Sequence, residues 1–287
     1  MSVKIKGINT APIKYGESFY LMTFKIQDFD NRHHIFYMNV EVLIDFLIVL
    51  RKRMLKVSKT LAEQGESYRD KLLSSSEALA KNVPTVLPVE VQQPDPRNLI
   101  MSLAPKFQDE QFTLIAMMQN EQVASLQIHD SQVEFILLAV QQALKVLDDK
   151  ETNQMIGSLL DFLLMYTVDL TNLEYLNFRE ISHEPWKQHL FAHHLAILYA
   201  FDTEQGERIL AGSIIKADAE PQSDELNNII QRLTVLTPML KELQEKHPIS
   251  HTYCQILPSQ PGQILNQDDC LRPLHAFCLE TQASRKA

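Results

Sequence analysis

Two stretches of this sequence, 93 residues apart, show the same order of three strand-like segments followed by a helical one. In the first stretch the strand-like segments are residues 3–8, 17–27 and 33–38, and in the second they are residues 98–103, 110–118 and 122–128. A shift of 93 positions aligns six identical residues within 25, namely Glu17/Glu110, Phe19/Phe112, Leu21/Leu114, Ile35/Ile128, Val40/Val133 and Glu41/Glu134. The pattern predicts an α+β protein with two or three repeated strand-strand-strand-helix units, each an antiparallel sheet covered by a helix.

Proline content suggests where these units are separated. Four prolines lie between positions 84 and 96, where they remove backbone donors and disfavour helix, so we expect a linker. Another apolar helix is expected over residues 152–166, and a third unit of similar element order follows it. The predicted organisation is a first unit at 1–83, a Pro-rich linker at 84–97, a second unit at 98–170, a third unit at 171–247 and a loop-rich tail at 248–287. Within this tail, residues 269–279 are expected to form a short closing helix.

The first helical segment carries a heptad pattern. One row of residues with a spacing of seven contains Leu43, Leu50, Val57 and Gln64, and the other contains Leu47, Met54, Leu61 and Tyr68. A helix over residues 40–73 would be about 50 Å long, whereas a nine-residue strand covers about 30 Å. The second half of the stripe therefore needs another partner. One hypothesis is a coiled-coil contact with a second copy, and the alternative is packing on this chain's own second unit or a break near Gly65.

Charge is unevenly distributed along the chain, whose net charge is −9. Residues 1–60 contain 10 Lys/Arg and 5 Asp/Glu, whereas residues 101–171 contain 3 and 10. The densest basic cluster includes Arg51, Lys52, Arg53 and Lys56, which could contact phosphate in a nucleic-acid-binding regulator. The acidic overall balance and the lack of interleaved aromatic residues argue against nucleic acid as the partner.

The sequence lacks the familiar catalytic signatures. A glycine-rich phosphate loop, a Gly-x-Ser-x-Gly elbow, a His-Glu-x-x-His helix and a Cys-x-x-Cys pair are all absent, which favours a non-enzymatic role. The best remaining constellation lies near the C-terminus and could bind zinc, either in a metal-dependent hydrolase or in a zinc-stabilised domain. Its candidate ligands are His247, His251, Cys254, Cys270, His275 and Cys278.

The hydropathy of the chain predicts a cytoplasmic protein. No apolar run reaches the roughly 18 residues that span a bilayer, and the first residues lack the apolar core of a signal peptide. With the heptad pattern and the opposed charges, these features predict a protein-binding or scaffold protein that self-associates through its first helix. A homo-oligomer or another protein is the expected partner, with no membrane partner.

The N-terminal segment resembles a known family. The residues Lys4-Ile-Lys-Gly-Ile-Asn9-Thr10, Phe19-Tyr-Leu and Ile26-Gln-Asp28 are similar to the opening of the YjeJ-like group of uncharacterised enterobacterial proteins. This resemblance extends over about the first 60 residues. It implies a bacterial cytoplasmic origin and no established activity, and it assigns no functional residue.

Overall fold

The computed structural model describes residues 2–147, 149–260 and 263–284, and it has both helices and antiparallel strands, which confirms the α+β class. The chain divides into two compact units, Met1–Leu160 (unit 1) and Asp161–Ala287 (unit 2). This division differs from the predicted one, because the segments at 1–83 and 98–160 belong to one unit and those at 171–247 and 248–287 to the other. Residues 261–262 and 285–287 of the predicted tail lie outside the described residues.

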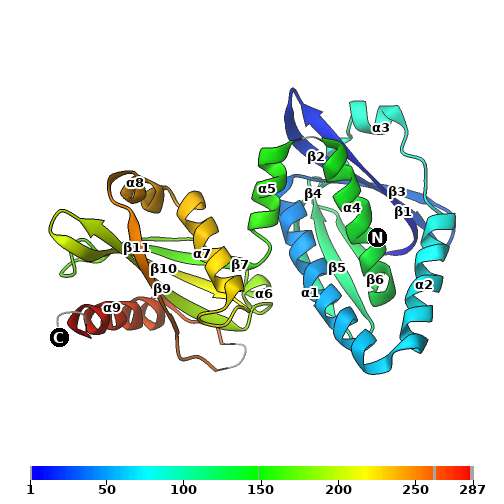
Figure 1. Cartoon of the computed structure of the whole chain (residues 1–287). Helices are drawn as coiled ribbons and strands as arrows, with labels where there is room; N and C mark the ends of the chain where they lie inside the picture. The colour runs from blue at the N-terminus through cyan, green and yellow to red at the C-terminus, as the bar shows by residue number, and fades with distance from the viewer. Residues whose placement is uncertain (1, 148, 261–262, 285–287) are drawn as a thin grey trace. The chain divides into compact units, whose positions relative to one another are not determined.

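Unit 1 is a closed six-stranded barrel with helices packed against it (Figure 1). Its strands are β1 (Ser2–Tyr15), β2 (Ser18–Asp28), β3 (His33–Met38), β4 (Leu99–Phe107), β5 (Gln111–Met118) and β6 (Val123–His129). Its helices are α1 (Val40–Gln64), α2 (Glu66–Lys81), α3 (Pro88–Gln92), α4 (Val133–Leu147) and α5 (Lys150–Ser158), with the short 3₁₀ turns η1 (Pro96–Asn98) and η2 (Asp130–Gln132).

The barrel closes where its two three-stranded halves meet. Within each half the strands are antiparallel, whereas β3 runs parallel to β4 and β1 runs parallel to β6. Both parallel pairings are short: β1 pairs with β6 only over Ser2–Lys4, and β3 pairs with β4 only at Tyr37 and Met38. The long helix after each half begins at Val40 and at Val133, 93 residues apart. Because β1 pairs with β6 over only three residues, most of that edge of β1 has no strand beside it and can be covered only by other elements.

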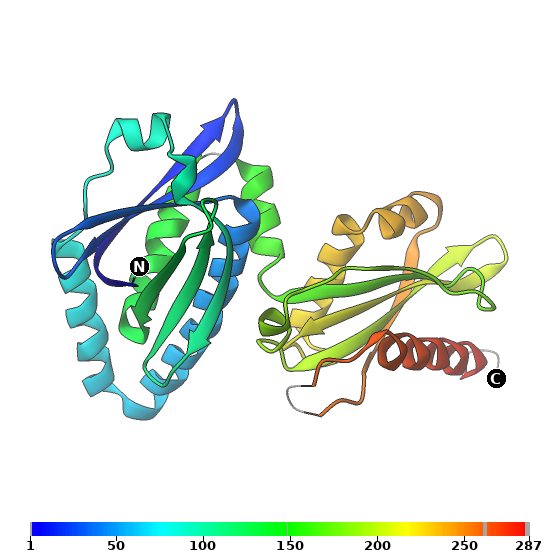
Figure 2. The same ribbon diagram turned by 180° about the vertical axis from the view of Figure 1, so that it is seen from behind.

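The predicted continuous helix over residues 40–73 is wrong. The helix ends at Gln64, and α2 begins at Glu66 after Gly65, whose φ is 63°. Glycine adopts this left-handed conformation without the steric cost that a Cβ adds, so the chain can change direction here. Figures 1 and 2 show that α2 runs back along unit 1 instead of extending α1. The hypothesis of a break in the helix near Gly65 is therefore confirmed.

The Pro-rich segment is not a free linker between domains. It contains α3, and the Glu90 carboxylate accepts a hydrogen bond of 2.6 Å from the Lys25 ammonium of β2. Both side chains of this ion pair are nearly buried, at 6% and 11% exposure. The Tyr37 hydroxyl donates to the Glu90 carbonyl at 2.8 Å, so the segment is docked on the barrel of unit 1.

Removing the carboxylate of Glu90 should release this segment. We expect Glu90→Ala to accelerate proteolytic cleavage within residues 84–97, because Lys25 loses its charged partner and the segment loses its anchor. Limited proteolysis followed by mass spectrometry measures the cleavage site and rate. Asp95→Ala, in the more exposed pair with Arg97, is the control, and equal cleavage rates in both variants would contradict the anchoring role.

Unit 2 is a five-stranded sheet with helices on both faces, in the strand order β11-β9-β10-β7-β8. Its strands are β7 (Phe162–Asp169), β8 (Asn177–Glu180), β9 (His193–Thr203), β10 (Gly206–Ala217) and β11 (Ile249–Ile256). Its helices are α6 (Pro185–Gln188), α7 (Asp224–Leu236), α8 (Pro238–Lys246) and α9 (Gln267–Ser284).

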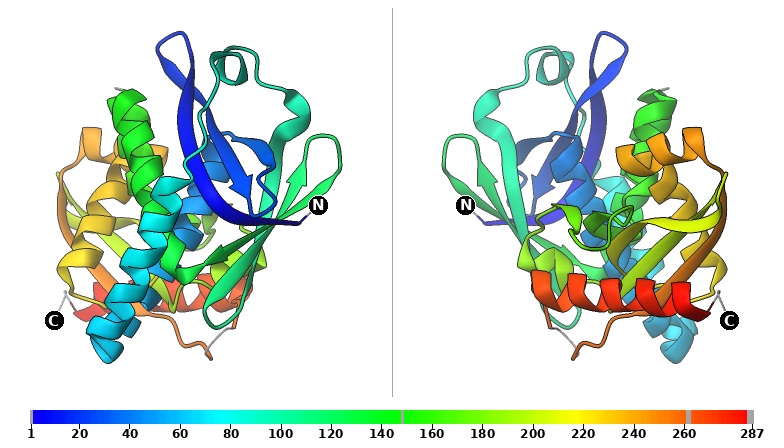
Figure 3. Two further views of the ribbon diagram at one scale, coloured as in Figure 1. Left: turned by 90° about the vertical axis from the view of Figure 1, so that its right-hand side faces the viewer. Right: turned by 90° about the vertical axis from the view of Figure 1, so that its left-hand side faces the viewer.

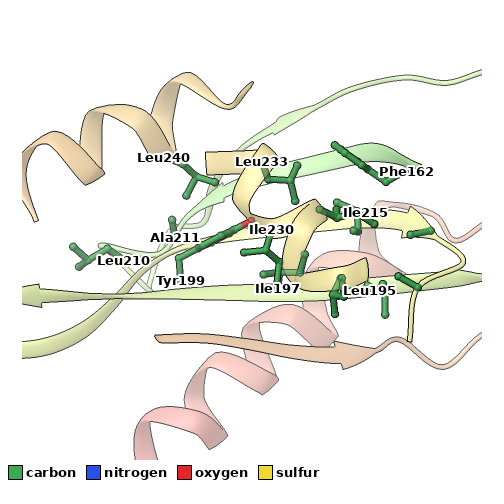
Figure 4. Close-up of a cluster of buried hydrophobic side chains, with 14 of the residues drawn as sticks. Phe162, Leu195, Ile197, Tyr199, Leu210, Ala211, Ile215, Ile230, Leu233 and Leu240 are labelled. Carbon is green, nitrogen blue, oxygen red and sulfur yellow. The ribbon is translucent and has the colours of Figure 1, made fainter. Parts of the chain in front are cut away.

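The main core of unit 2 lies under α7 and α8. Figure 4 shows Ile197 and Tyr199 of β9 meeting Ile230 and Leu233 of α7 and Leu240 of α8. The other face of the sheet is covered by α9, because a Cβ at Gly212 of β10 would lie 3.1 Å from Leu274. Figure 3 shows α9 as a separate red helix along this sheet.

Two predicted elements of this region differ in the structure. The helix expected over residues 152–166 is α5 followed by β7, since its second half supplies an inner strand to the sheet. The predicted loop-rich tail contains β11, which pairs with β9, and the 18-residue α9, which includes the shorter closing helix expected at residues 269–279. The pairing of β7 with β10 and β8, and that of β11 with β9, join residues that are distant in the sequence, so a local apolar pattern does not specify them.

Candidate functional site

The predicted coiled-coil residues are used inside unit 1. Leu43, Leu47 and Leu50 are at most 4% exposed within the core that α1 shares with the barrel. Val57 and Tyr68 form a second cluster, in which α2 packs against α1 together with Leu72, Met54 and Leu61. Gln64 is exposed at the end of α1. The apolar residues of the stripe are therefore packed within one chain, which leaves Gln64 as its exposed member.

The predicted phosphate contacts are also not gathered on an open surface. Arg53 is 6% exposed, and its Nε donates to Asp130 at 2.6 Å. Its terminal nitrogens donate to the carbonyls of Gln108 and Asp109 at 3.1 Å and 3.0 Å. Lys56 is bonded to the Asp109 carbonyl as well, and Arg51 and Lys52 also interact with other groups of the chain. Arg53 thus connects the β4–β5 turn to α1. Its guanidinium is already paired with the Asp130 carboxylate and is not open to a phosphate.

The six predicted zinc ligands are spread over unit 2. Cys254 packs in the core under α7 and α8, whereas Cys270 and Cys278 lie on α9, across the sheet. His251 is hydrogen-bonded to Glu207 at 3.1 Å, His247 caps α8, and His275 has a buried ring nitrogen without a hydrogen-bond partner in the described chain. Within the described residues, no three or more His, Cys, Asp or Glu side chains are arranged to hold a metal ion.

The cysteines have the chemistry of core residues. Burial raises the pKa of the Cys254 and Cys270 thiols to about 12 and that of Cys278 to about 11. At neutral pH these groups are protonated thiols, and the thiolate is the form that attacks substrates or ligates metals. Their role in this fold is packing.

A groove with exposed apolar side chains lies between β1 and α4 in unit 1. Its volume is about 530 Å³, and its wall on α4 includes Leu138 and Val146, which are 57% and 73% exposed. On the other side Val83 is 42% exposed, and the Thr10 hydroxyl donates to the Ala139 carbonyl at 2.9 Å, which holds α4 against β1. The lining is uncharged throughout and consists of Ile8, Asn9, Thr10, Ala11, Pro12, Val83, Phe135, Leu138, Ala139, Gln142, Ala143 and Val146.

The free edge of β1 at this groove is poorly suited to adding another strand. Pro12 has no amide hydrogen, and the amide of Thr10 donates at 2.8 Å to the side chain of Asn9. Both features remove donors that a strand addition needs, a common protection of exposed edges. The groove therefore favours contact through apolar side chains over a β-ladder.

The sequence patterns predict no candidate site on α4, although the helix carries one signal. The helix reads Val133-Glu-Phe-Ile-Leu-Leu-Ala-Val-Gln-Gln-Ala-Leu-Lys-Val-Leu147, and helical spacing places its polar residues, Glu134, Gln141, Gln142 and Lys145, on one side. Leu138 falls among them, on the side that an amphipathic helix turns to solvent. In the structure Leu138 is an apolar residue on the exposed side of α4.

Among the described helices, none has the length and apolar character needed to cross a bilayer. No solved structure matches this chain. Comparison with curated proteins finds the "Uncharacterized protein YjeJ" of Escherichia coli strain K12, which is 31% identical over 279 residues, covering 96% of this chain and 95% of that protein. The model of the YjeJ-like family matches residues 1–284. The chain therefore belongs to the YjeJ-like family.

Proposed function

We propose that this protein is a non-enzymatic protein-binding protein that self-associates through the groove between β1 and α4. The observation that carries the proposal is the exposure of Leu138 and Val146 on the α4 side of a groove whose lining is uncharged. We propose this groove as the self-association surface in place of α1, because the apolar residues of the α1 stripe are packed within unit 1. The proposed location is the cytoplasm, for which the support is the sequence pattern alone.

Helix packing supports the use of α4 as an interface. Leu138, Gln142 and Val146 follow one another at intervals of four residues, so they form a ridge along one side of the helix. Burying a side chain of the size of leucine or valine contributes roughly 1.5–3 kcal/mol. Burial of this ridge against a second copy therefore provides a hydrophobic driving force for dimerisation.

The absence of charge in the groove lining supports a second copy as the partner. A symmetric dimer interface places the same patch of both subunits together, so a charged patch would face its own charge. All twelve lining residues of the groove are uncharged, which removes this repulsion. A polar residue, Gln142, lies in the middle of the ridge, where its amide can pair with its own counterpart.

The test is the mass of the protein in solution. We expect the wild type to form a dimer in size-exclusion chromatography with light scattering, and Leu138→Lys to raise the dimer dissociation constant at least about tenfold, because both copies lose an apolar contact. Gln141→Lys, on the same helix outside the groove, is the matched control and should remain dimeric. Circular dichroism verifies that both variants are folded.

Two results would reject the proposal. The wild type could be monomeric at every concentration, or a folded Leu138→Lys variant could dimerise as strongly as the wild type. Selective loss of the dimer in Leu138→Lys, with Gln141→Lys unchanged, is the supporting result.

We also propose that the two halves of unit 1 are an internal repeat. Support comes from the shared strand pairing, the two parallel junctions and the start of α1 and α4 at positions 93 apart. The barrel is then a pair of similar halves within one chain.

A further inference from the structure

The second half of unit 1 has an outer face, formed by the side of β4, β5 and β6 that is turned away from α1. Figure 2 shows these strands in front of α1. Their inner side is packed, and the Phe112 ring lies 5.6 Å from the Arg53 guanidinium of α1. On the outer side Ile115, Met117 and Val123 are 42%, 43% and 45% exposed. The outer face consists of Ser102, Ala104, Lys106, Thr113, Ile115, Met117, Val123, Ser125 and Gln127.

The first half of unit 1 provides an internal comparison for this face, because the two halves have the same local geometry. Each has a turn with a positive φ, 61° at Asn31 and 63° at Glu121, and in both turns the amide of that residue donates to the carbonyl three residues earlier. Each also has a bulge near the start of its first strand, after Ile5 and after Ile100. Positions in β2 and β3 therefore match positions 90 residues later in β5 and β6.

At the matched positions the first half is polar where the outer face is apolar. Lys25 lies where the second half has Ile115, and Gln27 lies where it has Met117. The same turn and the same strand pairing form with polar side chains at these positions, so the fold does not require apolar ones there. Exposed apolar side chains that folding does not require indicate a surface for another molecule.

The first half also shows what covers a face of this kind. The segment that contains α3 lies on it: Val91 packs against the apolar cluster that includes Leu21, and the Glu90 carboxylate pairs with Lys25 at 2.6 Å. The covering segment is therefore short and combines valine side chains with a carboxylate. Ile115, the residue that matches Lys25, is 42% exposed, so no described segment of unit 1 covers the second half in the same way.

Two lysines give the outer face a positive charge. Lys106 of β4 and Lys4 of β1 lie in the row of cross-strand neighbours next to that of Ile115. Successive rows on one side of a sheet are about 7 Å apart. Both lysines are exposed, and neither makes a hydrogen bond or ion pair with a described residue. The acidic residues of the β4–β5 turn lie beyond this row, where Glu110 is already paired with Lys71 at 3.0 Å.

We propose that the outer face of β4–β6 binds a short acidic segment of another protein, whose apolar side chains cover Ile115 and Met117 while a carboxylate pairs with Lys106. The bound segment takes the place that the α3 segment has on the first half. This surface is separate from the groove between β1 and α4, so the proposal does not depend on self-association through that groove.

The methyl group of Met117 reports binding at this face. The probe is the synthetic peptide of residues 84–97 with blocked ends, because it has the chemistry of the segment that covers the first half. It is titrated into the full-length protein labelled with ¹³C at the methionine methyl groups. We expect a saturable shift of the Met117 methyl and no shift of the buried Met38 methyl. The same peptide with Glu90→Lys should bind at least about fivefold more weakly, because it lacks the carboxylate for Lys106.

Two variants of the protein separate the apolar and the charged contact. Ile115→Ser should weaken binding at least about tenfold, because the peptide then covers a polar side chain. Lys106→Glu should weaken binding at least about fivefold, because the peptide carboxylate then faces a like charge. Lys59→Glu, at an exposed lysine of α1 outside the outer face, is the matched control for charge and should leave binding unchanged. Circular dichroism verifies that all three variants are folded.

Three results would overturn the proposal. The Met117 methyl could stay unshifted at millimolar peptide, or the folded Ile115→Ser and Lys106→Glu variants could bind as tightly as the wild type. In the third, vesicles of phosphatidylglycerol and phosphatidylcholine shift the Met117 methyl and the peptide does not, which would assign the face to a membrane surface. Each of these results leaves the mass measurement on Leu138→Lys unaffected, so failure here is distinguishable from failure of the proposed self-association.

Discussion

Replacing Asp130 by alanine is expected to lower the free energy of unfolding by about 3–5 kcal/mol, because the variant leaves the buried cation of Arg53 without its anion. Asp130 is 4% exposed and accepts from Arg53 Nε at 2.6 Å, while the guanidinium lies 5.8 Å and 5.6 Å from the ring centroids of Phe107 and Phe112. Water therefore has little access to Arg53 if its partner is removed. Chemical denaturation followed by circular dichroism measures the change.

The control for this prediction is an exposed ion pair of the same unit. Glu66 and Arg69 pair at 3.2 Å with side chains that are 83% and 63% exposed, so Glu66→Ala should cost less than about 1 kcal/mol. In a double-mutant cycle, Arg53→Met combined with Asp130→Leu should cost less than the sum of the two single variants, because no unpaired charge stays buried. Strict additivity of the two substitutions would contradict the buried pair.

Leu50→Ala is expected to destabilise unit 1 by about 2–5 kcal/mol, the usual cost of a cavity in a packed core. Leu50 has no exposed surface, although the heptad pattern includes it in the predicted dimer interface. Leu55→Ala, on the same helix but 57% exposed, should change the free energy of unfolding by less than about 0.5 kcal/mol. Denaturant titrations of the two variants give the comparison.

Leu50→Lys distinguishes the core from a dimer interface more sharply. The structure predicts a protein that loses cooperative folding of unit 1, because a lysine would have to be buried without a partner. A coiled-coil interface would instead yield a folded monomer from a wild-type dimer. Finding that monomer by light scattering would restore α1 as the contact surface.

Local patterns in the sequence were enough to place many elements. The strand predicted at residues 17–27 follows from its β-branched and aromatic content and corresponds to β2, and the helix start at Val40 follows from the change of period. The α+β class rests on such local signals. The exposure of Leu138 was recoverable too, since helical spacing places it on the same side of α4 as Glu134, Gln141 and Lys145.

Other outcomes depend on contacts between distant residues. The apolar run after Thr152 suits a buried helix and an inner strand equally, and pairing with β10 makes Phe162–Asp169 a strand. The predicted zinc ligands are close in sequence, yet the sheet separates Cys254 from Cys270 and Cys278. Proline content predicts an irregular segment at 84–97, but the buried contact of Glu90 with Lys25 makes it part of unit 1.

The sequence by itself determined that α1 has an apolar stripe and that Gly65 can end the helix. The tertiary structure alone decided what covers that stripe. A heptad pattern indicates which side of a helix is apolar and is buried. It does not indicate whether the surface that buries it belongs to the same chain or to a second copy, because the hydrophobic gain from removing apolar surface from water is the same in both cases. Here the reversal at Gly65 and the closure of the barrel cover α1 from within, and an uncovered apolar surface lies on α4.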